Sequence, residues 1–373
     1  MELQLYYDRK ERDTDPIGIF IDTFDVDFQH RFSLSERQEI IWGLGYRFST
    51  DDFTNTFSMS MDPDSRHDQL LSLFVQDEIT LIEDCLHLTM GSKFEDNDYT
   101  GFEIQPSARV MWTPRERHSL WAAVSRAVRT PSRSESDVRI NSRVLPPDML
   151  FPGSPPVVTA LFGDRDLKSE ELLAYEVGYR VRPTDVLSLD MAAFFSDYGN
   201  LHTLEMEEMF PEASPSPEHL VIPLRIDHKM DGKAYGIEMA AELQVLDWWH
   251  LKAAYTYLQE HLHLDGDSQD IRSEAAEGEN PRNQLSLRSC MDLPRNVELD
   301  LWARYVDSLR SQDVGSYVTL DARLSWRPHG NLELSLVGQD LLDDHHPEFV
   351  PEIIETAPSE VERSVYGKIA WRF

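Results

Sequence analysis

The chain has 373 residues, with 67 acidic and 35 basic (Lys and Arg) side chains and a formal net charge of −32. This charge excludes a nucleic-acid-binding protein, which needs a basic surface to neutralise phosphates. A hydrophobic content of 41% argues against disorder. The two cysteines, Cys85 and Cys290, are too few for a disulfide scaffold. The N-terminus carries no basic and apolar leader, so we expect either a cytoplasmic protein or a chain whose front end is missing.

Apolar and polar residues alternate strictly in several segments. In chain order, the clearest are Leu187–Phe195, Trp249–Tyr255, Val297–Tyr305, Tyr317–Arg327 and Leu332–Leu341. Alternation with a period of two is typical of strands that have one apolar face. Many segments reach about 10 residues, the length of a tilted membrane strand. The mean hydropathy of −0.44 fits such strands, since their two faces average out.

The connections between these strands alternate between short and long. Short ones are expected near Ser33–Arg37, Glu83–Asp84, Pro114–Arg117, Arg182–Asp185, Leu246–Asp247, Pro294–Asn296 and Pro328–Asn331. Long ones are expected near Asp8–Pro16, Thr54–Arg66, Glu95–Gly101, Pro131–Glu170, Glu205–Pro223, Asp265–Arg282, Ser308–Ser316 and Asp343–Arg363. This rhythm predicts an all-β, antiparallel up-and-down transmembrane barrel of about 16 strands. Within it, Leu220–Asp231 is either one long strand with Tyr235–Val245 or a separate hairpin.

Aromatic residues recur near the expected strand ends, as in the girdles at the two surfaces of a membrane barrel. Aromatic residues also favour strands of any kind, which is the simpler interpretation. The set comprises Trp42, Trp112, Trp248, Trp249, Tyr255, Tyr257, Trp302, Trp326, Trp371 and Phe373.

Five segments, in this order, resemble the C-terminal barrel of TonB-dependent outer-membrane receptors. They are Ser125–Glu135, Leu167–Arg180, Tyr235–Glu238, Gly338–Phe349 and Ser364–Phe373. The second is similar to the family's "L-x-x-E…YE-x-G-Y" strand, and the fourth to its "N-L-L-D-x-x-H-x-E-F" block, with Asp340 where the family usually has Asn. The resemblance is clear over residues 100–373 and rests on strand style before that.

The resemblance implies an outer-membrane transporter of a Gram-negative cell that imports a scarce nutrient, most simply a ferric siderophore. Family members have about 22 strands and a plug domain in the lumen. This sequence has no plug, energy-coupling box or signal peptide, so residues 1–373 are expected to be the C-terminal part of the barrel domain, a fragment. The implied partners are the nutrient, outer-membrane lipid and the barrel-assembly machinery, with the TonB complex only in an intact relative.

Candidate ligand-binding residues are Arg126, Arg129 and Arg133, which precede the longest connection. The resemblance implies that such loops close over an anionic ligand, and arginine suits that contact. Arg139 and Arg143 are equally well placed, and arginine also pairs with carboxylates that line a lumen. Trp371 and Phe373 end the last strand and resemble the signal that the assembly machinery reads by strand addition. An ordinary last strand has the same alternation.

No pattern of catalysis is present: there is no G-x-S-x-G, H-E-x-x-H or Walker loop, so we expect no enzyme and no cofactor. The His261/His263 and His345/His346 pairs lack the spacing of a closed metal site, and we expect none. The acidic run Asp265–Glu279 is expected to be a solvated loop.

Two alternatives remain open at this point. A passive porin-like channel of about 16 strands predicts that Glu2–Asp8 pairs with Ser364–Phe373. A soluble all-β hydrolase or binding module predicts that Trp326 and Trp371 face a dry core.

Overall fold

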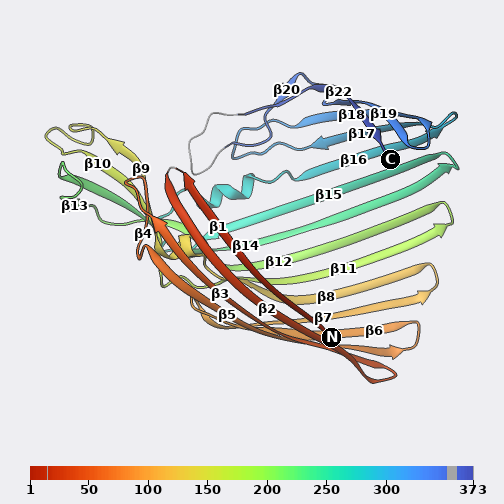
Figure 1. Cartoon of the computed structure of the whole chain (residues 1–373), viewed down its shortest axis with the longest axis horizontal. Helices are drawn as coiled ribbons and strands as arrows, with labels where there is room; N and C mark the ends of the chain where they lie inside the picture. Colours follow the sequence, from red (N-terminus) through yellow and green to blue (C-terminus); the bar gives the residue numbers. More distant parts are fainter. Residues whose placement is uncertain (15, 351–358, 373) are drawn as a thin grey trace.

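A computed structural model describes residues 1–14, 16–350 and 359–372 of the chain, and almost all of its regular structure is β. Within these residues, 16 strands follow one another as antiparallel neighbours in a single curled sheet (Figure 1). They are β1 (Glu2–Thr14), β2 (Ile17–Ser35), β3 (Gln38–Thr54), β5 (Ser65–Ile82), β6 (Leu86–Asn97), β7 (Gly101–Arg115), β8 (His118–Arg129), β11 (Glu170–Thr184), β12 (Leu187–Met206), β14 (His219–Leu246), β15 (Trp249–Leu264), β16 (Asn283–Leu293), β17 (Val297–Val306), β18 (Tyr317–His329), β19 (Leu332–Gln339) and β22 (Ser364–Trp371). The predicted up-and-down order of about 16 strands is confirmed. No helix in the described part of the chain is long and apolar enough to cross a membrane.

The strand register assigns one apolar face and one polar face to the whole sheet. One transverse row joins Ala122, Val177, Ala193, Ile237 and Tyr257 across five neighbouring strands. Val177 is 55% exposed and Ile237 is 46% exposed, so this row lies on the outside of the curl. We call this side of the sheet the outward face, and the opposite side, which lines the hollow, the inward face.

Polar residues that alternate with this apolar face point inward, as β18 shows. In β18, Val318, Leu324 and Trp326 are 47–48% exposed, whereas Thr319 and Ser325 are 2% and 1% exposed. The predicted apolar outward faces are confirmed.

Two inward-facing aromatic rings lie flat against glycines of the neighbouring strand. A Cβ atom on Gly178 would come within 2.2 Å of the Trp121 indole nitrogen, and one on Gly236 within 2.7 Å of the Phe194 ring. Only glycine permits this approach, because any side chain would push the ring off the wall. The rings therefore stay close to the wall, and the hollow stays open.

Exposed tryptophans gather near the short turns. Trp112, Trp248, Trp326 and Trp371 are 47%, 42%, 47% and 69% exposed. This placement supports a girdle at that end of the apolar band. Trp302 does not belong to it: its indole donates to the Ser286 hydroxyl on the inward face, and Arg304 lies 4.4 Å above its ring.

The same sheet has an extension of short strands at the loop end, which is the end of the barrel that carries the long connections. The extension comprises β4 (Met59–Met61), β9 (Val138–Leu145), β10 (Val157–Phe162) and the first part of β14. β10 runs parallel to β14, with Val157 opposite Leu220, and β13 (Phe210–Glu212) pairs with the other side of β14. Buried Val158, Ala160 and Val221 form a small core there. Leu220–Asp231 is therefore part of one long strand, the first of the two predicted alternatives.

Two of the predicted long connections are wrong. β1 continues to Thr14 and β2 begins at Ile17, so most of Asp8–Pro16 is strand. Only three residues, Asp98–Thr100, separate β6 from β7 where Glu95–Gly101 was expected to be a loop. In both places the strands extend beyond the apolar band, where polar residues on both faces remove the alternation. Residues 351–358 of the predicted Asp343–Arg363 loop lie outside the described residues.

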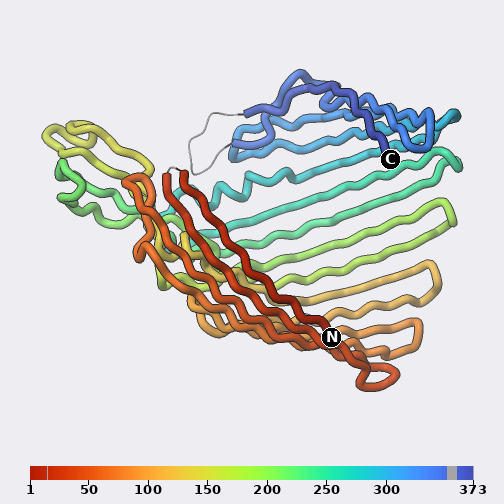
Figure 2. Tube along the Cα trace, in the orientation of Figure 1, coloured from red at the N-terminus to blue at the C-terminus, as the bar shows by residue number. Residues whose placement is uncertain are grey.

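The two ends of the ladder stay apart. β1 pairs with β2 along its whole length and β22 pairs with β19, and neither has a second partner among residues 1–14, 16–350 and 359–372. Figure 2 shows both chain ends toward the side of the short turns, on opposite walls. The pairing expected of a closed channel of 16 strands is therefore wrong. The dry core expected of a soluble protein is also wrong, because Trp326 and Trp371 are exposed.

Candidate functional site at the loop end

The longest connection begins with a short helix, α1 (Arg133–Asp137), directly after β8. Ser132 is its N-cap: its hydroxyl accepts from the Glu135 amide, and the Glu135 carboxylate accepts from the Ser132 amide at 2.7 Å. This reciprocal capping box fixes the start of the helix. As a result, Arg133 and Asp137 project together from one turn, four residues apart.

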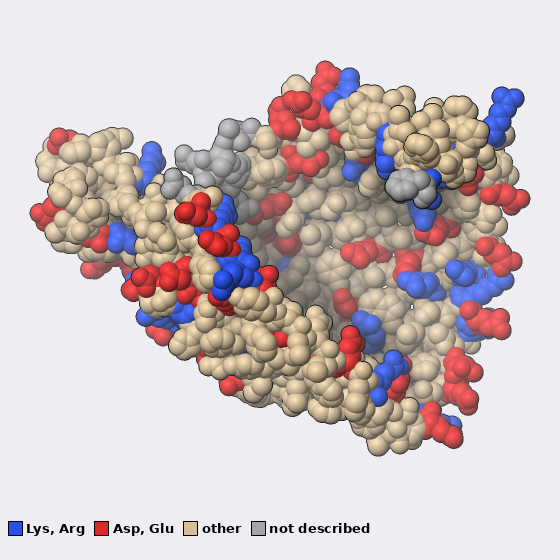
Figure 3. Space-filling view, viewed as in Figure 1, with Lys and Arg blue, Asp and Glu red and all other residues tan. Residues whose placement is uncertain are grey.

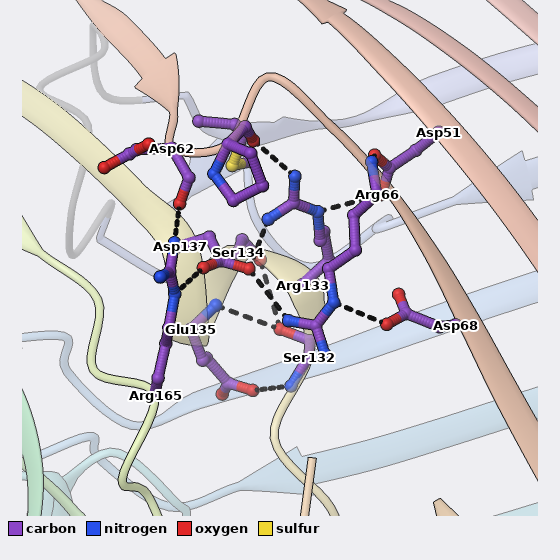
Figure 4. A network of polar contacts seen from close by, with 12 residues as sticks. Asp51, Asp62, Arg66, Asp68, Ser132, Arg133, Ser134, Glu135, Asp137 and Arg165 are labelled. Carbon is purple, nitrogen blue, oxygen red and sulfur yellow. Dashed lines mark hydrogen bonds and ion pairs between the residues drawn. The ribbon is translucent and has the colours of Figure 1, made fainter. Parts of the chain in front are cut away.

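Three arginines converge on the Asp137 carboxylate, whose side chain is fully buried (Figure 4). Arg66 reaches it from β5 at 3.0 Å, and Arg165 from the far end of the connection at 2.5 Å; Arg133 completes the set. Burial by itself raises the pKa of Asp137, but the arginines outweigh it and hold the pKa below its usual value. The carboxylate is therefore ionised and fully engaged.

The same arginines bind carboxylates of the barrel wall. Arg133 donates to Asp51 of β3 at 2.9 Å, and Arg66 pairs with Asp68 of β5 at 2.7 Å. The Tyr99 hydroxyl, in the turn between β6 and β7, donates to Asp68 at 2.7 Å. Burial and the bond to Asp68 raise the pKa of Tyr99, which keeps it a donor. We call Arg66, Arg133, Arg165 and Asp137 the Asp137 network; it attaches the longest connection to three parts of the wall.

Arg129 forms a second group beside α1. Its guanidinium binds Glu170 at 2.7 Å, Glu135 at 2.9 Å and the His202 ring at 2.8 Å. The register places Arg129 on the same inward face as Trp121. Its side chain is 48% exposed, compared with 12% for Arg133. Of the predicted ligand-binding residues, Arg129 is thus the one that combines an inward position with access to solvent.

Arg126 lies elsewhere. It pairs in register with Leu173 on the outward face, and it binds Glu171 at 3.1 Å. The structure therefore brings Arg129 and Arg133 together around α1 and leaves Arg126 on the outside of the wall. Trp371 ends β22 on the outward face, and Phe373 lies outside the described residues.

Several residues of the Asp137 network were missed by reasoning from sequence. The pattern Ser132-x-x-Glu135 was a readable signal for a helix start. Arg66 and Asp137 are 71 positions apart, and no local pattern connects them.

The acidic run Asp265–Glu279 was expected to be a solvated loop, but part of it is buried. Asp270 is 7% exposed and accepts hydrogen bonds from the Leu204 amide at 2.6 Å and from Ser273. Burial by itself raises the pKa of Asp270, but these hydrogen-bond donors outweigh it and hold the pKa below its ordinary value. The run thus packs against the end of β12.

Acidic and basic side chains are intermixed around the hollow (Figure 3). Arg323 pairs with Asp300 at 3.0 Å and with Glu333 at 2.7 Å, and Arg304 pairs with Asp321 at 2.9 Å. Within the described residues, no group of three or more His, Cys, Asp or Glu side chains is arranged to hold a metal ion. These arginines of the wall are therefore engaged in ion pairs with carboxylates of neighbouring strands.

Comparison with known proteins adds a decisive observation. The model of the family described as "TonB dependent receptor-like, beta-barrel" matches residues 3–341. The chain belongs to this TonB-dependent receptor barrel family. Members of the family are transporters, not enzymes. No curated protein matches.

Solved structures of TonB-dependent receptors share the fold at low identity. The siderophore receptor PirA of Acinetobacter baumannii is 14% identical, with a TM-score of 0.71 over 97% of this chain and 56% of its own. A variant of the ferric enterobactin receptor PfeA of Pseudomonas aeruginosa is 17% identical (TM-score 0.72; 95% and 54%). The FrpB iron transporter of Neisseria meningitidis is 13% identical (0.68; 96% and 56%). The chain spans a little over half the length of these relatives.

The five segments that resemble TonB-receptor motifs lie in strands of the wall or directly beside them. Ser125–Glu135 joins β8 to α1, Leu167–Arg180 enters β11, and Tyr235–Glu238 lies within β14. Gly338–Phe349 follows β19 into the last long connection, and the described part of Ser364–Phe373 is the final strand. The first two motifs thus frame the candidate site, since they supply Arg129, Glu135 and Glu170.

Proposed function

We propose that this chain forms the wall and external mouth of an outer-membrane transporter, in a Gram-negative cell, that takes up a ferric siderophore. The observation that carries the proposal is the continuous ladder with an apolar outward face and its long connections at one end. Family membership supports it, and the printed names of the structural relatives include siderophore and ferric enterobactin receptors. Residues 1–373 are then one part of a barrel domain, without a plug among the described residues.

The ligand-binding role proposed for the three arginines is best supported at Arg129. Its guanidinium is inward, half exposed, and already aligned by Glu135 and Glu170. An anionic chelate that displaced one carboxylate would gain a charge-assisted hydrogen bond. Arg133 is enclosed in the Asp137 network and Arg126 faces outward, so both are less accessible from the mouth.

Substitution of Arg129 tests this proposal. With ferric enterobactin as the probe and the full chain purified in detergent, we expect Arg129→Ala to weaken binding by about tenfold or more, the size of a lost charge-assisted hydrogen bond. Arg126→Ala is the matched control and should leave the affinity unchanged. Tryptophan fluorescence quenching measures both. If the unaltered chain binds neither ferric enterobactin nor another ferric siderophore, the transport proposal is wrong. If the unaltered chain binds the probe and Arg129→Ala binds it with the same affinity, the assignment of Arg129 is wrong.

The last strand also supports a role in assembly. β22 carries Val365, Ile369 and Trp371 outward, at 64%, 75% and 69% exposure. Its second edge has no partner among the described residues, so it is open to strand addition. We therefore propose the barrel-assembly machinery as a partner that recognises Trp371 and Phe373.

A further inference from the structure

A pocket opens on the outward face of the wall, outside the hollow and its mouth. Its volume is about 680 Å³, and it extends across β8, β11, β12, β14 and β15. A transverse row of five residues in register crosses its floor: Arg126, Leu173, Asp197, Lys233 and His261. Glu171, Asp231 and His263 extend it toward the loop end.

The register fixes the height of this pocket. The next row toward the short turns is Val124, Tyr175, Phe195, Tyr235 and Gln259, and the row after it is wholly apolar apart from the Tyr257 hydroxyl. Tyr175 and Phe195 pack with ring centroids 6.4 Å apart. The pocket therefore begins where the apolar band ends, on the side of the long connections. In a membrane this is the depth of the lipid headgroups of the outer leaflet.

The chemistry of the lining is mixed. Lys233 is a donor and Asp197 and Asp231 are acceptors, whereas Arg126 and Glu171 form an ion pair with each other at 3.1 Å. Lys233 makes no ion pair with any residue that the structure describes. The ring of His261, which lines the pocket, lies 6.0 Å from the Tyr235 ring in the next row toward the short turns. Three carboxylates disfavour an isolated phosphate. A group rich in hydroxyls fits better, since each hydroxyl both donates and accepts, and aromatic rings pack well on the apolar side of a sugar.

We propose that this pocket binds the sugar headgroup of a glycolipid in the outer leaflet. The site is independent of the mouth and of any ferric ligand. It would place the lipid against five strands at the level where the wall passes from apolar to charged. Arg126 lies on the opposite face of β8 from Arg129, and in this proposal it lines the lipid pocket.

Lipid retention tests the proposal. The full chain is reconstituted in nanodiscs of phosphatidylglycerol containing either a glucosyl diacylglycerol or phosphatidic acid, and the lipids that remain bound are counted by native mass spectrometry. We expect preferential retention of the glucosyl lipid, reduced about a hundredfold in the Asp197→Ala/Lys233→Ala double variant, as expected for the loss of two hydrogen bonds to charged side chains. Asp96→Ala is the matched control, because Asp96 is an exposed outward carboxylate on β6 outside the pocket.

Three results would overturn the proposal: no preference for the glucosyl lipid in the unaltered chain, a preference for phosphatidic acid, which would make this a phosphate site, or equal retention by the double variant. If the double variant does not insert, Lys233→Gln, which keeps a donor but removes the charge, replaces it. This variant is expected to keep the preference for the sugar, and loss of that preference would contradict the proposed role of hydroxyl recognition.

Discussion

Asp137→Ala is expected to release the longest connection from the barrel wall. The change leaves Arg66 and Arg133, whose side chains are 21% and 12% exposed, without their shared carboxylate. Breaking a buried ion pair by removing one partner costs about 3–5 kcal/mol of unfolding free energy. We expect most of this cost to appear locally, as faster hydrogen exchange at Gly163 and Asp164, whose amides donate to Val138 and Glu135.

The local character of the effect separates it from general damage. Asp166→Ala alters an exposed carboxylate of the same connection and should change neither exchange nor protease sensitivity. Asp137→Asn keeps the shape and one acceptor, and should fall between the two. Equal exchange in Asp137→Ala and Asp166→Ala would mean that the Asp137 network does not hold the connection.

Ile237→Arg is expected to impair insertion of the barrel in a membrane. Ile237 is 46% exposed in the middle of the outward face, between Ala193 and Tyr257. An arginine on the lipid face near the bilayer midplane costs about 2–4 kcal/mol. The measurement is the free energy of unfolding from lipid vesicles in urea.

The adjacent inward position provides the control. Glu238 follows Ile237 on β14 and points to the polar hollow, so Glu238→Arg should change the unfolding free energy much less. If both variants behave alike, the assignment of the outward face is wrong.

The wall could be predicted from sequence because its determinants are local. Alternation in Tyr317–Arg327 and Leu332–Leu341 reports directly which face is apolar, and the register of β18 and β19 preserves it. The prediction failed at Asp8–Pro16 and Glu95–Gly101, where strands leave the apolar band and the pattern that identifies them ends.

The loop end could not be predicted in the same way. β10 pairs with β14 across a separation of about 60 residues, as Val157 opposite Leu220 illustrates, and Arg66 meets Asp137 over 71. Such pairings depend on the assembled wall that brings these segments together. The candidate arginines were predicted because they precede the longest connection, but only the fold shows that Arg126 lies on the outward face while Arg129 lies on the inward face.

The central claim is that alternate residues of each strand face lipid and the water-filled hollow. Single cysteines placed at consecutive positions 237–240 of β14, in a chain with Cys85 and Cys290 replaced by serine, test it most directly after reconstitution in vesicles. A membrane-impermeant maleimide should label positions 238 and 240, whereas positions 237 and 239 should be protected and accessible to a lipid-soluble reagent. Uniform labelling along β14, or the opposite alternation, would contradict the account.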